Sequence, residues 1–61
     1  MDRWEAAQLA RLRSVASDVT ALDACIEVLR QRRSDDTLLR AAELTERLHR
    51  EVTAIIDDLR A

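Results

Sequence analysis

The sequence predicts an all-α protein, an antiparallel helical hairpin that assembles into a dimeric four-helix bundle. Two observations support this fold class. The 61 residues contain no glycine and no proline, the residues that β-hairpins and tight turns favour. Apolar side chains recur three and four residues apart in both halves of the chain, which is typical of helices that each bury one face. We expect residues 1–61 to form a single hairpin domain.

The first helix is expected over about residues 3–32. Asp2 is suited to cap its start, with Glu5 three residues later as in a capping box. Apolar residues then follow one another at gaps of 3, 4, 3, 4 and 3 residues, the spacing of the a and d positions of a heptad. We expect this seam to contribute six residues to the oligomer core: Leu12, Val15, Val19, Leu22, Ile26 and Leu29.

The second helix is expected over about residues 36–60. Ala41 and Thr45 belong to its seam, together with five residues assigned to the oligomer core: Leu38, Leu48, Val52, Ile55 and Leu59. Leu44 and Ile56 widen the stripe on its two sides, which suits a bundle helix that touches more than one neighbour. On the opposite face, Glu43–Arg47 and Glu46–Arg50 have the i,i+4 spacing of helical ion pairs, worth about 0.2–0.5 kcal/mol each.

The offset between the two seams predicts a break in the chain. Leu38 lies nine residues after Leu29, whereas a continuous heptad requires four or eleven. The intervening segment runs from arginines, which suit a helix C-terminus, to Ser34 and two aspartates, which suit the next N-terminus. The turn is therefore placed at about residues 33–36. A single bent helix is the alternative that the pattern leaves open.

A lone hairpin of this size leaves much of its apolar surface in water and is marginally stable. Self-association as a homodimer, or docking on a larger protein, removes that cost. The expected architecture resembles that of the plasmid-encoded Rop hairpin dimers, in architecture alone and without a shared motif. The orientation of the chains stays open, because valine and isoleucine at a with leucine at d also suit a parallel coiled coil.

Composition excludes several classes of protein. The one cysteine, Cys25, forms no internal disulfide and builds no cysteine-based zinc site. No apolar run is long enough for a membrane span, and the first residues lack the pattern of a signal peptide. The expected location is therefore the cytoplasm, without membrane contact. All ten basic residues are arginine, which points to a GC-rich bacterial or phage genome.

The sequence assigns no catalytic, cofactor-binding or metal-binding residue, and we expect neither a cofactor nor enzymatic activity. Glu46 and His49 have the Glu-x-x-His spacing of di-iron bundles, but His49 lies at the edge of the seam and Glu46 outside it. We interpret them as a solvated carboxylate and a boundary histidine. Cys25 flanks the seam and is interpreted as structural.

The predicted function is that of a small non-enzymatic protein-interaction module, either a regulator, an inhibitor or an assembly subunit, which acts through a helix face. Apolar residues outside the seams are candidate partner contacts: Trp4, Val28, Leu39, Leu44 and Ile56. The alternative is a Rop-like nucleic-acid-binding hairpin dimer. Its candidate anion contacts cluster near the turn: Arg30, Arg32, Arg33 and Arg40.

Overall fold

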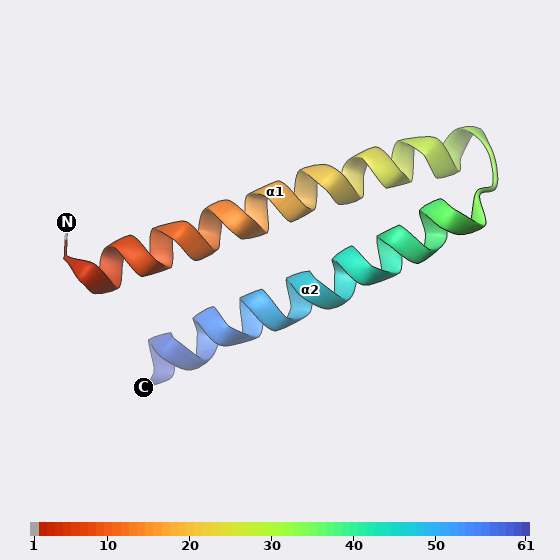
Figure 1. Ribbon diagram of the computed structural model, residues 1–61. Helices are drawn as coiled ribbons and strands as arrows, with labels where there is room; N and C mark the ends of the chain where they lie inside the picture. The colour runs from red at the N-terminus through yellow and green to blue at the C-terminus, as the bar shows by residue number, and fades with distance from the viewer. Residues whose placement is uncertain (1) are drawn as a thin grey trace.

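The computed structural model describes residues 2–61 and consists of two helices, α1 (Arg3–Gln31) and α2 (Asp35–Arg60). The helices are antiparallel and joined by a short loop, so both chain ends lie at the same end of an elongated molecule (Figure 1). Its principal extents are 45 × 19 × 13 Å. The prediction of an all-helical, two-helix hairpin is confirmed.

Each helix begins at a capping side chain. The Asp2 carboxylate accepts a hydrogen bond from the backbone N–H of Glu5, at 2.8 Å. At α2, the Ser34 hydroxyl oxygen accepts hydrogen bonds from the backbone N–H of Thr37 at 3.2 Å and from its hydroxyl at 2.9 Å. These contacts satisfy donors that a helix start leaves without an intrahelical partner.

The loop reverses the chain without glycine because its backbone is extended. Arg32 has φ −161° and ψ 155°, and Ser34 has φ −146° and ψ 112°. Within residues 2–61 no residue has a positive φ. Glycine is favoured after a helix where a residue must adopt the left-handed conformation. No residue of this connection adopts that conformation.

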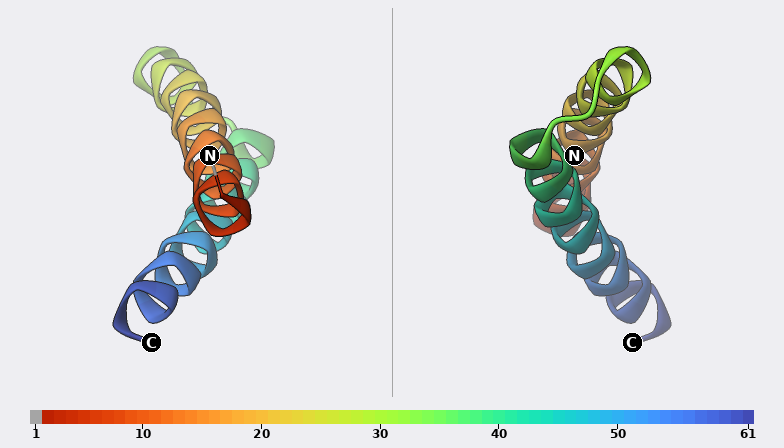
Figure 2. Two further views of the ribbon diagram at one scale, coloured as in Figure 1. Left: turned by 90° about the vertical axis from the view of Figure 1, so that its left-hand side faces the viewer. Right: turned by 90° about the vertical axis from the view of Figure 1, so that its right-hand side faces the viewer.

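The two helices cross when the molecule is viewed along its length (Figure 2). Leu44 of α2 lies at the centre of the contact with 1% of its surface exposed, and it is the one fully buried apolar side chain among residues 2–61. The residues around it are half-buried: Val15, Leu22, Cys25 and Leu29 on α1, and Thr37, Ala41, Leu48 and Ile55 on α2. One buried leucine makes a small core for a chain of this length.

The contact between the helices takes in only part of the predicted seams. Of the eleven seam residues assigned to the oligomer core, five are half-buried: Val15, Leu22, Leu29, Leu48 and Ile55. Six others are exposed in the hairpin, with exposed fractions of 39–64%: Leu12, Val19, Ile26, Leu38, Val52 and Leu59. Leu44, expected at the margin as a partner contact, is instead buried between the helices, because the centre of the contact on α2 is rotated toward it.

Candidate interaction surface

Seven of the nine large apolar residues that are exposed within residues 2–61 follow a simple rule of position. Leu12, Val19 and Ile26 on α1 come directly after Arg11, Asp18 and Cys25, which lie at the contact between the helices. On α2, Leu38, Val52, Ile56 and Leu59 likewise come directly after Thr37, Glu51, Ile55 and Asp58. One residue is a rotation of about 100° around a helix. Each exposed apolar side chain therefore stands about a quarter turn away from the helix–helix contact.

The same rotation leads to the same side of the hairpin on both helices. Two antiparallel helices are related by a two-fold axis normal to their mean plane. A rotation about this axis exchanges the two helices and leaves each side of the plane where it was. Equal rotations from the contact thus converge on one side. We call this surface the apolar face, formed by Leu12, Val19, Ile26, Leu38, Val52, Ile56 and Leu59.

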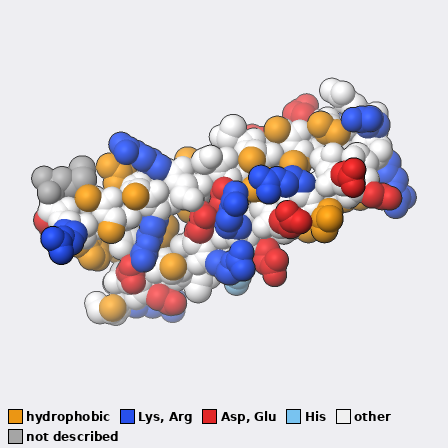
Figure 3. Space-filling view, viewed as in Figure 1, with side chains coloured by type: hydrophobic (Ala, Val, Ile, Leu, Met, Phe, Trp, Pro, Cys, Tyr) orange, Lys and Arg blue, Asp and Glu red, His pale blue; other side chains and the backbone are white. Residues whose placement is uncertain are grey.

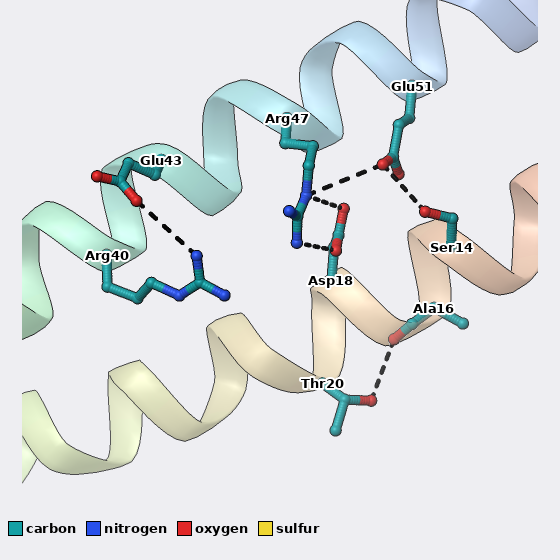
Figure 4. Close-up of polar contacts among 8 residues, drawn as sticks. All are labelled: Ser14, Ala16, Asp18, Thr20, Arg40, Glu43, Arg47 and Glu51. Carbon is teal, nitrogen blue, oxygen red and sulfur yellow. Dashed lines mark hydrogen bonds and ion pairs between the residues drawn. The ribbon is translucent and has the colours of Figure 1, made fainter.

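The other side of the contact holds a network of charged residues (Figure 4). The Arg47 guanidinium donates two hydrogen bonds to the carboxylate of Asp18, at 3.0 and 2.6 Å. Asp18 is 4% exposed and is the one buried charged residue among residues 2–61. Glu51 lies 4.0 Å from Arg47 and accepts a hydrogen bond from the Ser14 hydroxyl at 3.0 Å. A buried carboxylate needs such a partner, since burial without one is costly.

Neither of the two expected ion pairs, Glu43–Arg47 and Glu46–Arg50, is formed within residues 2–61. Arg47 reaches across to Asp18 on α1 and does not take Glu43 as its partner, while Glu43 is approached by Arg40 at 3.8 Å. The bidentate contact to a buried carboxylate outcompetes an exposed i,i+4 pair, which gains little in water. The face shown in Figure 3 likewise carries acidic and basic side chains next to one another along the line where the helices meet.

Hydrogen bonds set the protonation of the two aspartates that link the helices. Those from Arg47 hold the pKa of Asp18 below its usual value of 3.8, against the opposing effect of burial. Hydrogen bonds from Arg11 and Gln8 likewise lower the pKa of Asp58. Both aspartates are therefore charged at neutral pH and link α1 to α2.

The arginines near the turn are engaged with carboxylates of the same chain. Arg30 pairs with Glu27 at 3.0 Å, and Arg33 with Asp35 at 3.4 Å. Arg40 pairs with Glu43, and Arg32 directly follows the last residue of α1. The local positive charge that would attract phosphate is thereby reduced.

The remaining candidate contacts do not converge on one surface. Trp4 is 53% exposed near the start of α1, and Leu39 is 63% exposed on α2. Leu39 lines an open groove of about 620 Å³ along α2, which it shares with Glu46 and His49. Val28 is half-buried and lines a smaller groove of about 280 Å³ beside Cys25, near the turn.

The described residues offer little for metal chemistry. Glu46 and His49 are both exposed on α2. Within residues 2–61, no group of three or more His, Cys, Asp or Glu side chains is placed to hold a metal ion. Neither α1 nor α2 has an apolar stretch of the length that crossing a membrane requires.

Sequence reasoning missed the Asp18–Arg47 link, which is the most buried polar contact of the hairpin. A search for apolar periodicity skips charged positions. The available signal was antiparallel pairing about the turn, which brings Asp18 level with Arg47 and Ser14 level with Glu51.

No protein family, curated protein or solved structure matches this chain. Its function is therefore inferred from the surfaces of the hairpin.

Proposed function

We propose that this protein is a small non-enzymatic interaction module, acting as a regulator, an inhibitor or an assembly subunit, and that it works as a dimeric four-helix bundle. The observation that supports the proposal is the apolar face. Seven aliphatic side chains, each 39–64% exposed, lie on one side of a hairpin that fully buries only Leu44 among its described apolar residues. Exposed apolar surface gathered on one side of a molecule marks interaction sites in soluble proteins.

The distribution of charge agrees with this function. Ion pairs join α1 to α2 on the side of the hairpin opposite the apolar face. On the apolar face, by contrast, the aliphatic side chains remain 39–64% exposed to water. Covering it removes apolar area from water at about 25 cal/mol per Å².

Sedimentation equilibrium over a wide range of concentrations tests the proposal. We expect a species of twice the 7.0 kDa chain mass, with helical circular dichroism that is lost as dilution dissociates it. A folded 7.0 kDa monomer at every concentration would contradict the proposal.

Nucleic-acid binding is the second candidate, favoured by Arg30, Arg32 and Arg33 lying within one turn of the loop. It ranks behind protein interaction because Arg30 and Arg33 are paired with carboxylates. A gel shift with RNA and DNA at increasing salt separates the two, since phosphate contacts weaken steeply with salt. Binding that is lost on replacing these arginines would favour the second candidate.

A further inference from the structure

We infer that the occupant of the apolar face is a second copy of this chain, laid face to face with its turn at the opposite end. This rests on the proposed function, which already includes a dimer, and it goes further by assigning the face that the two copies share and their orientation. Three properties of the hairpin carry it: its excess surface, the symmetry of the apolar face and the charge of its two ends.

The excess surface has the size that one partner of a stable complex buries. A compact monomer of 7.0 kDa exposes about 4,000 Å², whereas this hairpin exposes 4900 Å². The difference of roughly 900 Å² is close to the ~800 Å² that each partner buries in a standard interface. The radius of gyration, 14.3 Å, likewise exceeds the ~10.5 Å of a compact chain of this length.

Five of the seven residues of the apolar face are arranged symmetrically about one level of the hairpin. On α1, Leu12 and Ile26 lie seven residues to either side of Val19. Val19 follows Asp18, whose carboxylate binds Arg47, so Arg47 marks nearly the same level on α2.

Two of the four α2 residues of the apolar face are arranged about that level in the same way, whereas Val52 and Leu59 lie opposite Ala42 and Asp35. Leu38 and Ile56 lie nine residues to either side of Arg47, and Thr45 and His49 lie two residues to either side. The centre of this arrangement therefore lies at nearly the same level on both helices.

Five of the seven residues are thus symmetric about a line across both helices, so each of them faces an apolar residue of a second copy turned by 180° about that line. Leu12 then meets Ile26 of the second copy, Leu38 meets Ile56 of the second copy, and Val19 meets its own counterpart. The exposed Thr45 and His49 form a polar layer at the centre, where a polar residue in an apolar seam fixes register.

The two ends of the hairpin carry net charges of opposite sign, as this orientation requires. The turn end, residues 27–40, carries four arginines and three carboxylates, and the open end, residues 2–6 and 56–60, carries two arginines and four carboxylates. Turns at opposite ends bring the net positive end of each copy beside the net negative end of the other. Turns at the same end would place like charges together, and such electrostatics selects orientation more than affinity.

The distance between spin labels on the two turns tests the arrangement. The labelled variant carries Cys25→Ala and Gln31→Cys, which leaves the charges of the turn end unchanged, and pulsed electron paramagnetic resonance measures the separation between copies. Gln31 lies twelve residues from Val19, so at 1.5 Å per residue opposite turns give roughly 36 Å. Turns at the same end give about 20 Å or less, two helix diameters.

A control label at Ala16→Cys, in the same Cys25→Ala background, lies near the centre and gives a short distance in either orientation. Sedimentation of each labelled variant accompanies the measurement. A dimer with a short distance between the Gln31→Cys labels overturns the arrangement and leaves the proposed function standing. A monomer, folded or unfolded, at every concentration overturns both, and an unfolded one points to a different protein on this face.

Discussion

At the scale of single residues, the hairpin depends on Leu44 and on the Asp18–Arg47 pair. Leu44 is the one described apolar side chain that is fully buried, and Asp18 is the one described charged residue that is buried. One supplies apolar packing at the helix contact, and the other links α1 to α2 beside it.

Leu44→Ala is expected to lower the free energy of unfolding by about 2–5 kcal/mol, the range for truncating a buried leucine. That is comparable to the whole ~3–5 kcal/mol that a core of this size supplies, so the variant loses helix content at 25 °C. Leu39→Ala is the matched control, because Leu39 is on the same helix and 63% exposed. Urea denaturation followed by circular dichroism measures both, and equal effects would show that the assigned faces are wrong.

Acid is expected to destabilise the hairpin through Asp18. Arg47 lowers the pKa of Asp18 in the folded state below 3.8, so the unfolded chain takes up the proton first as the pH falls. The stabilisation from the pair is complete above about pH 4 and is lost as the pH falls through the lowered pKa. Asp58 adds a change of the same sign. Thermal melts of the protein and of Asp18→Asn between pH 7 and 2 measure this, and the variant should show a flatter acid limb.

At the scale of the elements, each helix is specified by its ends as well as by its apolar stripe. The Ser34 hydroxyl caps α2 directly after the extended loop. The same residue separates α2 from the arginines that end α1. The reversal therefore depends on a cap and on extended backbone, with no left-handed residue within the described chain.

Ser34→Ala is expected to lower the free energy of unfolding by about 1 kcal/mol, the usual cost of removing a serine N-cap. Ser17→Ala serves as the control, since Ser17 is exposed within α1 and alanine favours helix there. Urea unfolding of both variants provides the comparison. Equal or greater loss with Ser17→Ala would contradict the capping role.

At the scale of the whole molecule, the hairpin has two unlike sides. One is crossed by ion pairs between α1 and α2, and the other is the apolar face. The apolar face forms the interface of the inferred dimer.

Val19→Glu is expected to weaken dimerisation by about 100-fold or more, because it places two like charges against each other at the symmetry axis. Val19 is 47% exposed, so the packing between α1 and α2 is little disturbed. Ser17→Glu adds the same charge at an exposed position off the apolar face and should leave the dimer unchanged. Sedimentation velocity of the two variants decides the matter, and equal dimer formation would place the interface elsewhere.

The sequence by itself determined the elements of this protein. Heptad spacing predicted the helices, and the offset between Leu29 and Leu38 predicted the break, because periodicity and capping are local properties of the chain. Asp2 was also identified as a cap on local grounds, and the structure confirms its hydrogen bond to Glu5.

The tertiary structure alone decided how each helix is rotated. A stripe wider than one contact satisfies several rotations, so the pattern does not say whether Leu44 or Val52 faces α1. The structure buries Leu44 and leaves Val52 exposed. The pairing of Asp18 with Arg47 accompanies that rotation, since a buried carboxylate is stable only where a guanidinium from the other helix reaches it. Which apolar residues remain free for a partner follows from the same rotation, and for this reason the apolar face emerged only once the two helices were packed together.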